Sequence, residues 1–238
     1  MRLGRGSRML RVITWNVRHL RDDAGALAAV LRALDPDVVC LQETPRGLRH
    51  RARLAALARA AGLVVVAGGR SAGYTAVLAH RRTSSTDRCE LLFPRRPGLH
   101  QRGVALVSFR TRAGVVAVGS VHLGLDAEER LDHVDRLLHL AAGLTDGPVV
   151  LGGDLNESPG GPAWRALSRR FADASELVGA RGAAGPTYPA RAPRVRIDAV
   201  FVAPAVRVRS ADVPPLPAGV PAYEVATDHL PVLADLEL

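Results

Sequence analysis

Lysine is absent from the sequence, so all 32 of its strongly basic side chains belong to arginine. Cysteine is scarce, and Cys40 and Cys89 fit neither a disulfide framework nor a zinc-binding spacing. Residues 1–9 are basic but lack the apolar stretch of a secretory signal, and no apolar run is long enough to span a membrane. We therefore expect a reduced, cytoplasmic protein with no membrane span and with a loose basic N-terminus over residues 1–9.

The formal net charge of +9 leaves two explanations open. The planar guanidinium group of arginine matches phosphate oxygens, and a basic chain attracts polyanions such as nucleic acids. A composition rich in arginine, alanine and glycine is also typical of a GC-rich genome, which would explain the arginines without any role in binding. The charge alone therefore supports a nucleic-acid partner without deciding for one.

The length of 238 residues, of which 47% are hydrophobic, is enough to bury a full core. Apolar and β-branched runs predict strands, and stripes of leucine and alanine predict helices. The expected strands cover residues 10–16, 37–43, 63–67, 74–79, 88–93, 103–109, 115–122, 148–152, 196–202 and the C-terminus. The first expected helix is capped by Asp22 or Asp23 and ends before Asp35-Pro36, and the others cover residues 45–61, 126–142 and 162–170. No linker separates two domains, so we expect a single domain over residues 1–238, and a monomer.

The expected strand 148–152 runs directly into Gly153-Asp154-Leu155-Asn156. Glycine lets the backbone turn tightly at this point, so that a carboxylate and a carboxamide stand together where a central strand ends. In open α/β sheets this edge is the usual place for a ligand. The alternative is a turn in which Asp154 and Asn156 satisfy only their own backbone.

Other polar residues lie at the end or at the start of further expected strands. Each of them alone could be a helix cap or a satisfied surface group, but burying so many carboxylates is costly unless they bind a metal or pair with histidines. Oxygen ligands suit Mg²⁺, and the histidines lack a zinc-like spacing. The full set is Asn16, Glu43, His122, Asp154, Asn156, Asp198, Asp228 and His229.

In order along the chain, these residues resemble the motifs of the endonuclease/exonuclease/phosphatase superfamily of DNase I-like, metal-dependent phosphoesterases. The motifs that carry the resemblance are Thr-Trp-Asn16, Leu-Gln-Glu43, Ser-Val-His122, Gly-Gly-Asp154-Leu-Asn156, Arg-Ile-Asp198 and Thr-Asp228-His229-Leu-Pro-Val. The resemblance spans residues 14–232 and implies an α/β (α+β) fold, a four-layer sandwich of two packed mixed β-sheets flanked by helices. It also implies a hydrolase whose active site lies at one end of the sandwich.

The resemblance implies a metal site for Mg²⁺, with Mn²⁺ as an alternative. Glu43 matches the principal ligand of the ion. Asn16 matches a neighbouring position on the ion or its water, and Asp228 matches a further carboxylate close to it.

The same resemblance implies catalytic roles for five residues. His229 matches the histidine that contacts the scissile phosphate, and Asp198 the carboxylate that orients it. Asp154 matches the group that aligns or deprotonates the attacking water, and Asn156 the amide that steadies the charge of the phosphate. His122 is a candidate proton donor to the leaving oxygen.

The motifs leave more than one substrate class open. Arg18 and Pro45 depart from the pattern of abasic-site endonucleases, and the chain is shorter than sphingomyelinase-type or inositol-phosphatase relatives. We expect a phosphodiester substrate and a nuclease-type activity, with arginines of residues 80–103 and 181–196 contacting nucleic acid. The alternatives are an enzyme for a small or lipid-derived phosphate and, less in keeping with the intact motifs, an inactive binding protein.

Overall fold

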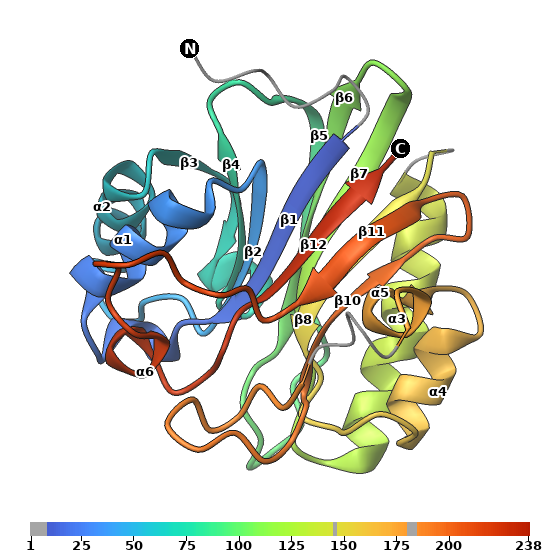
Figure 1. Ribbon diagram of the computed structural model, residues 1–238. Coiled ribbons are helices and arrows are strands. Elements are labelled where there is room, and N and C mark those ends of the chain that lie inside the picture. The colour runs from blue at the N-terminus through green and yellow to red at the C-terminus, as the bar shows by residue number, and fades with distance from the viewer. Residues whose placement is uncertain (1–8, 145–146, 180–184) are drawn as a thin grey trace.

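The computed structural model describes residues 9–144, 147–179 and 185–238, and it contains two β-sheets of six strands each (Figure 1). The first sheet has the order β11 (Arg207–Asp212), β12 (Val232–Glu237), β1 (Met9–Asn16), β2 (Val38–Gln42), β4 (Thr75–His80) and β3 (Leu63–Gly69). The second sheet has the order β5 (Ser84–Leu92), β6 (Gly103–Thr111), β7 (Gly114–His122), β8 (Val149–Asp154), β10 (Asp198–Val202) and β9 (Ala172–Asp173).

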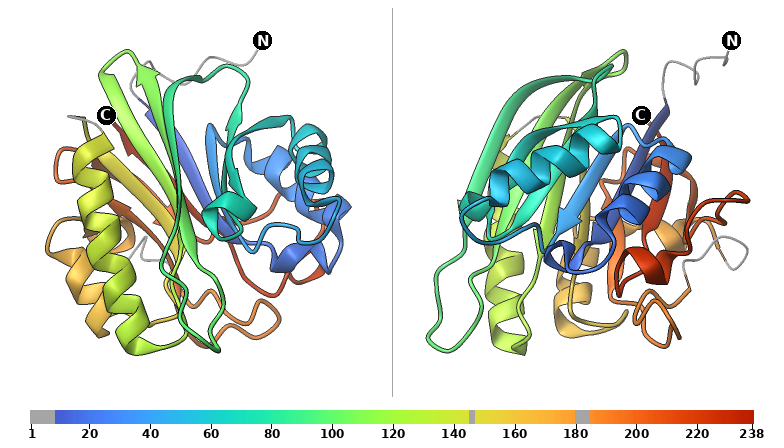
Figure 2. Two further views of the ribbon diagram at one scale, coloured as in Figure 1. Left: turned by 180° about the vertical axis from the view of Figure 1, so that it is seen from behind. Right: turned by 90° about the vertical axis from the view of Figure 1, so that its left-hand side faces the viewer.

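Helices cover the outer faces of both sheets, which gives the four layers that the sequence predicts (Figure 2). Helices α1 (Ala24–Leu34) and α2 (His50–Ala60) pack on the first sheet, and α3 (Ala127–Leu144) and α4 (Pro162–Ser168) pack on the second. The remaining short elements are the 3₁₀ turns η1 (Arg18–Leu20) and η2 (Arg70–Ala72) and the helices α5 (Ala174–Leu177) and α6 (Tyr223–Ala226).

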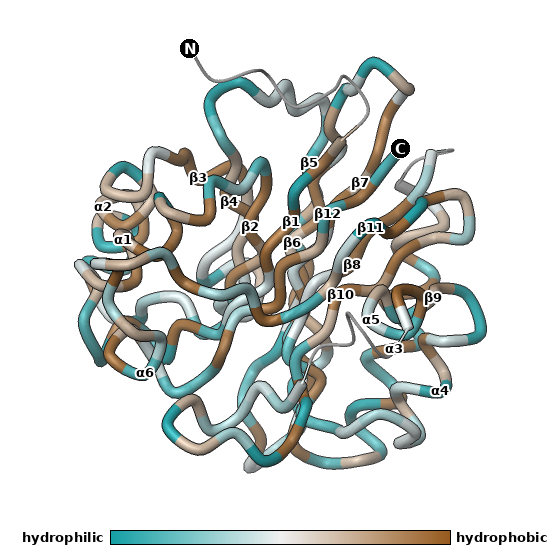
Figure 3. Tube along the Cα trace, viewed as in Figure 1, coloured by the Kyte–Doolittle hydropathy of each residue, from teal (hydrophilic) through white to brown (hydrophobic). Residues whose placement is uncertain are grey.

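Side chains that alternate along each strand fill the spaces on both of its faces. Val12 and Val38 of the first sheet meet Val118 and Val150 of the second in the core between the sheets, whereas Ile13 points the other way and packs under α1. Hydropathy is therefore high along the central strands (Figure 3). This burial on both faces explains why these strands are near-continuous apolar runs in the sequence. The single domain stays a prediction, supported by a core that both sheets share.

The strands that carry the polar motifs end at one level. Strands β7 and β8 are parallel and place His122 opposite Asp154, and the antiparallel strand β10 begins with Asp198, also opposite Asp154. In the first sheet the parallel strands β1 and β2 pair Asn16 with Gln42 at their ends. Chain register alone therefore gathers these side chains at one end of the sandwich.

Several boundaries differ from those expected. Helix α2 begins at His50 and not at residue 45, because Gly47 takes a left-handed φ of 84° and accepts a hydrogen bond from the His50 backbone N–H, which forms a turn. Strand β1 begins at Met9, inside the segment expected to be loose, and residues 1–8 lie outside the described residues. Strand β11 and helix α6 occupy stretches where the sequence predicts no element. Among the described residues, no helix has the length and apolar character needed to cross a membrane.

Gly152 of β8 sets how closely the two sheets approach. A Cβ atom at this position would lie 2.9 Å from the Cβ of Thr14 and 3.0 Å from the Cβ of Cys40, both on the facing sheet. We expect Gly152→Ala to lower the free energy of unfolding in urea by about 1–3 kcal/mol, because an overpacked core must shift its neighbours. Gly143→Ala, on helix α3 with no atom within 4 Å of its new Cβ, is the matched control. Equal stability of the two variants would contradict this account of the sheet packing.

Candidate active site

Asp154, at the end of strand β8, is the centre of the site. It is 1% exposed, and its Oδ2 accepts a hydrogen bond from Asn16 Nδ2 at 2.9 Å. Since Asn16 ends β1, this bond joins the two sheets. The other oxygen, Oδ1, accepts the backbone N–H of Asn156 at 2.9 Å, so the turn expected from the sequence is present as well. Asp154 therefore both satisfies its own turn and connects the sheets.

A second polar contact joins the sheets directly below Asp154. The side-chain amide of Gln42 donates hydrogen bonds to Thr14 Oγ1 on β1 and to Ser120 Oγ on β7, each at 3.1 Å. All three side chains are buried. Buried polar groups must be paired to avoid a desolvation cost, so this cluster fixes the register of β1, β2 and β7 under the site.

His229 and Asp198 form a buried pair beside Asp154. His229 Nδ1 donates a hydrogen bond to Asp198 Oδ2 at 2.9 Å, while its Nε2 lies 3.9 Å from Asp154 Oδ2. The indole N–H of Trp15 donates to the His229 carbonyl at 2.9 Å, and the Tyr188 ring lies 4.8 Å from the imidazole. A histidine held by a carboxylate in this way presents its second nitrogen to the site in a fixed orientation.

Burial and charge move the ionisation of these groups in opposite directions. Burial tends to lower the pKa of His229, but the charge and hydrogen bond of Asp198, together with the charge of Asp154, outweigh it and raise the pKa to about 9. Burial, reinforced by the charge of Asp198, raises the pKa of Asp154 to about 6. At neutral pH, His229 is therefore an imidazolium, and Asp154 is a carboxylate that readily accepts a proton.

His122, at the end of β7, lies on the other side of Asp154 with Nε2 3.4 Å from Oδ2. The Asn156 side-chain nitrogen lies 3.0 Å from the same ring nitrogen. Arg102 contacts His122 Nδ1 at 2.9 Å, and because a guanidinium group can only donate, Nδ1 must accept. Burial first, and then the charge of Arg102, hold the pKa of His122 well below its ordinary value. His122 is therefore a neutral imidazole.

Two of the predicted residues, Glu43 and Asp228, pair with residues outside the predicted set. Glu43 has a left-handed φ of 51°, and its Oε2 lies 3.2 Å from His19 Nε2. Asp228 Oδ2 lies 3.2 Å from Arg18 Nε. The structure thus joins six predicted residues around Asp154 in one network, and it places Glu43 and Asp228 against the η1 turn. The six are Asn16, His122, Asp154, Asn156, Asp198 and His229.

The donor set fits a divalent cation. Asp154 and Asp198 each offer a carboxylate oxygen, and these atoms lie within 4.8 Å of one another and of a His229 ring nitrogen. As an imidazolium, His229 could join them as a ligand only after losing its Nε2 proton. Asp198 Oδ1 is buried without a hydrogen-bond partner among the described residues, as a vacant ligand oxygen would be. Glu43, whose side chain is 26% exposed, offers a second location at the same end of the sandwich.

Two residues of the site were not predicted from the sequence. Arg102 is 6% exposed and directly precedes strand β6. Its position before the strand that pairs with β7 is the one sequence feature that could have indicated its place beside His122. His19 lies in the η1 turn, where three successive residues have positive φ, and no sequence pattern indicates such a turn. Non-glycine residues with positive φ tend to gather at functional sites, and Asn156, with a φ of 48°, is a further case.

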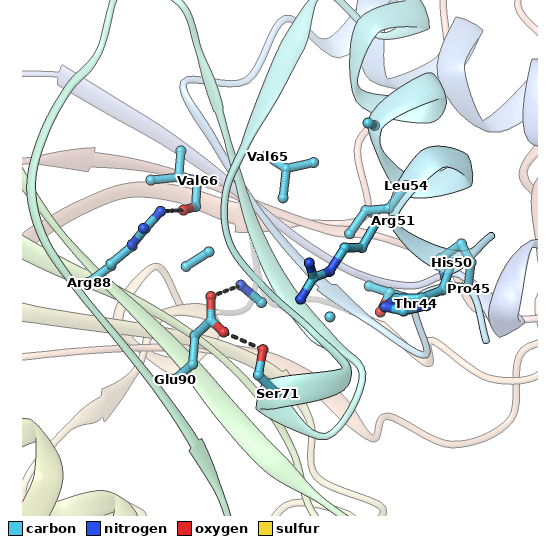
Figure 4. Close-up of a pocket in the computed structure, with 14 residues that line it drawn as sticks. Thr44, Pro45, His50, Arg51, Leu54, Val65, Val66, Ser71, Arg88 and Glu90 are labelled. Carbon is cyan, nitrogen blue, oxygen red and sulfur yellow. Dashed lines mark hydrogen bonds between the residues drawn. The ribbon is translucent and has the colours of Figure 1, made fainter. Parts of the chain in front are cut away.

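A cavity of about 650 Å³ lies between α2, β3 and β5. Thr44 and Pro45, which follow Glu43 in the chain, contribute to its lining, as do Arg51 and Arg88 (Figure 4). The Glu90 carboxylate accepts hydrogen bonds from Ser71 and from the Gly68 backbone in the same wall. None of the eight predicted residues lines this cavity, so it is separate from the His229–Asp198 pair.

Comparisons with known proteins agree with the fold and the motifs. The model of the Endonuclease/Exonuclease/phosphatase family matches residues 13–229. No curated protein matches the sequence.

Solved structures with similar folds cover nearly the whole chain. An endonuclease/exonuclease/phosphatase from Bacteroides vulgatus is 19% identical with a TM-score of 0.79, covering 97% of this chain and 99% of its own. The mannosyl-6-phosphatase Bt3783 of Bacteroides thetaiotaomicron is 16% identical with a TM-score of 0.76 (96% and 100% covered). D. rerio TDP2, complexed with a single-strand DNA product, is 19% identical with a TM-score of 0.76 (97% and 99%). With its DNase I-like fold and a family match over most of its length, this chain belongs to the endonuclease/exonuclease/phosphatase family.

Proposed function

We propose that this chain is a divalent-metal-dependent phosphodiesterase with a nuclease-type activity, using Mg²⁺ or, as the alternative, Mn²⁺. Membership of the family makes it a hydrolase of phosphate esters. The observation that carries the proposal is the buried His229–Asp198 pair with Nε2 of His229 directed toward Asp154. This arrangement provides a fixed cation and a proton-accepting carboxylate next to each other.

In the proposed reaction a water oxygen attacks phosphorus and the ester P–O bond opposite to it breaks. Asp154 aligns the water and takes its proton, a task suited to a carboxylate whose pKa is raised to about 6. His229 contacts the phosphate as an imidazolium and stabilises the charge that builds up on the equatorial oxygens, and Asp198 keeps it oriented. Asn156 donates to the same oxygens.

For the proton donor to the leaving oxygen we propose His229 in place of His122, the candidate from the sequence. A neutral imidazole that gave up its Nε2 proton would become an imidazolate. The free-energy cost of forming this buried anion is not offset by the neighbouring charge of Arg102. With Nδ1 accepting from Arg102, Nε2 carries the one proton of the neutral ring and lies 3.4 Å from Asp154 Oδ2. The proton for the leaving oxygen is then supplied more readily by the His229 imidazolium.

Glu43 would hold the metal ion, and Asn16 and Asp228 match motif positions close to that ion. Such an ion supplies a positive charge that neutralises non-bridging oxygens and the leaving oxygen. The Asn16 amide donates to Asp154 and so links the proposed metal site to the proposed catalytic residues. Arg18 contacts Asp228, which directly precedes His229, and makes a second link of this kind.

Nucleic acid is the leading substrate class because exposed arginines border the site. Arg95 precedes β6 in the loop that leads to Arg102, and Arg191 and Arg194 lie in the segment before β10. All three are exposed, and within the described part of the chain none of them forms an ion pair. Arg82 and Arg196, by contrast, pair with Asp37 and Asp173 and have structural roles. The DNA product bound by TDP2 is compatible with this substrate class.

A small phosphate is the second candidate. The cavity beside Glu43 could enclose a compact substrate, and a mannosyl-6-phosphatase shares the fold. The monomeric state, the single domain and the cytoplasmic location also remain proposals, the last of them supported by two free cysteines.

We expect His229→Ala to lower kcat on the order of 10²–10⁴-fold, because the charge next to the phosphate is lost. The measurement is hydrolysis of a chromogenic phosphodiester, plasmid DNA and an abasic-site duplex, each with Mg²⁺ or with chelator. His139→Ala, an exposed histidine of helix α3, is the control and should retain full activity. Chelator-resistant hydrolysis, or an unimpaired His229→Ala enzyme, would contradict the mechanism.

The arginines separate the two substrate classes. Replacing Arg95, Arg191 and Arg194 together with glutamine should raise KM for DNA and lower the slope of log KM against log salt by about 0.7–0.9 for each DNA phosphate that is no longer neutralised. Turnover of the small diester should not change. The triple replacement of Arg110, Arg112 and Arg207 with glutamine, at the far end of the sandwich, removes the same three charges and controls for net charge. If the triple variant cleaves DNA normally, the small-phosphate alternative is favoured.

A further inference from the structure

The η1 turn, which follows strand β1, has a backbone conformation that ordinary residues avoid. Arg18, His19 and Leu20 have φ values of 44°, 57° and 54°. For L-residues with a side chain this left-handed conformation costs roughly 1–2 kcal/mol each. A turn of this kind persists only where surrounding contacts hold it, and such contacts point to a function.

The contacts that hold the turn lead to Glu43. The backbone N–H of His19 donates a hydrogen bond to the Glu43 carbonyl at 2.6 Å. The Arg53 side chain donates to the Leu20 carbonyl at 2.9 Å, and the Tyr74 ring meets the imidazole edge to face at 6.3 Å. The His19 ring is thus fixed in position, with its side chain only 11% exposed.

The hydrogen bonds of His19 determine which ring nitrogen carries the proton. Nδ1 lies 2.9 Å from the carbonyl oxygen of Thr44, and a carbonyl can only accept, so Nδ1 must be the N–H. In a neutral imidazole Nε2 then has a lone pair. This lone pair faces Glu43 Oε2 at 3.2 Å, so two acceptors meet with no donor between them.

Either a second ring proton or a metal ion resolves this conflict, and the distance suits a metal ion. Bonds of about 2.1 Å place neighbouring ligand atoms roughly 3.0 Å apart in an octahedral site and 3.4 Å apart in a tetrahedral one. The separation of 3.2 Å lies between these values. Histidine ligands of metals also usually donate their other ring N–H to a backbone carbonyl or carboxylate, as His19 does to Thr44.

We propose that His19 Nε2 binds the active-site cation together with Glu43, and that the site therefore prefers Mn²⁺ or another transition-metal ion to Mg²⁺. The preference follows because imidazole nitrogen suits transition metals, whereas Mg²⁺ takes oxygen ligands. This inference rests on the proposed function in one respect, the presence of a cation at Glu43. The competing explanation is an imidazolium–glutamate ion pair with no metal on the ring.

The test uses the full chain loaded with Mn²⁺ and reads the metal directly. Electron spin echo spectroscopy should detect ¹⁴N modulation from a coordinated imidazole in the unmodified protein. His19→Asn should remove that modulation, and asparagine is chosen because it tolerates left-handed φ better than most residues. In calorimetric titrations the variant should lose about 10-fold or more in Mn²⁺ affinity. Its Mg²⁺ affinity, which depends on oxygen ligands, should change by less than about 3-fold.

Several results would overturn the inference. Absence of ¹⁴N modulation in the unmodified protein, or its persistence in His19→Asn, would place the ion away from His19. An unchanged ratio of Mn²⁺ to Mg²⁺ affinity would do the same. His139→Asn is the control for histidine loss, and circular dichroism checks that each variant is folded.

A second variant separates this inference from the proposed function. If Glu43→Gln abolishes Mn²⁺ binding while His19→Asn leaves it intact, the metal site stands and the histidine ligand is wrong. If the unmodified protein binds no divalent cation, both are wrong.

Discussion

The buried carboxylate of Asp154 is the constraint on which the rest of the site depends. A buried charge is costly unless it is fully hydrogen-bonded, and Asp154 obtains its donors from different parts of the fold. Asn16 reaches it from the facing sheet and Asn156 from its own turn. The bond from Asn16 exists only if β1 and β8 end at the same level and the sheets approach closely, which the absence of a side chain at Gly152 permits.

Asp198 sets the electrostatics around that carboxylate. Burial raises the pKa of Asp154, and the charge of Asp198 adds to this rise; against the effect of burial, the charge and hydrogen bond of Asp198 also raise the pKa of His229. One group is thereby prepared to accept a proton near neutral pH, and the other keeps its positive charge. His122, in contrast, is held neutral by burial and by Arg102. Pairs of titratable groups whose environments push their pKa values apart are the usual basis of acid–base assignments.

The sequence predicts most residues of the candidate site because those residues stand at the ends of predicted strands. His122 and Asp154 end parallel neighbours, so the register of β7 and β8 brings them together without further information. His19 could not be found in this way, since its position depends on a left-handed turn held by contacts with Glu43 and Arg53. The partnership of Arg18 with Asp228 likewise depends on that turn.

The charge of His229 tests the account most directly. In ¹⁵N spectra of the histidine side chains, assigned by comparison with His229→Gln, both ring nitrogens of His229 should stay protonated from pH 6 until the pH rises through about 9. Asp198→Asn should shift this transition to lower pH, because the charge that sustains the imidazolium is removed. A His229 ring that is neutral at pH 7 in the unmodified protein would contradict the account.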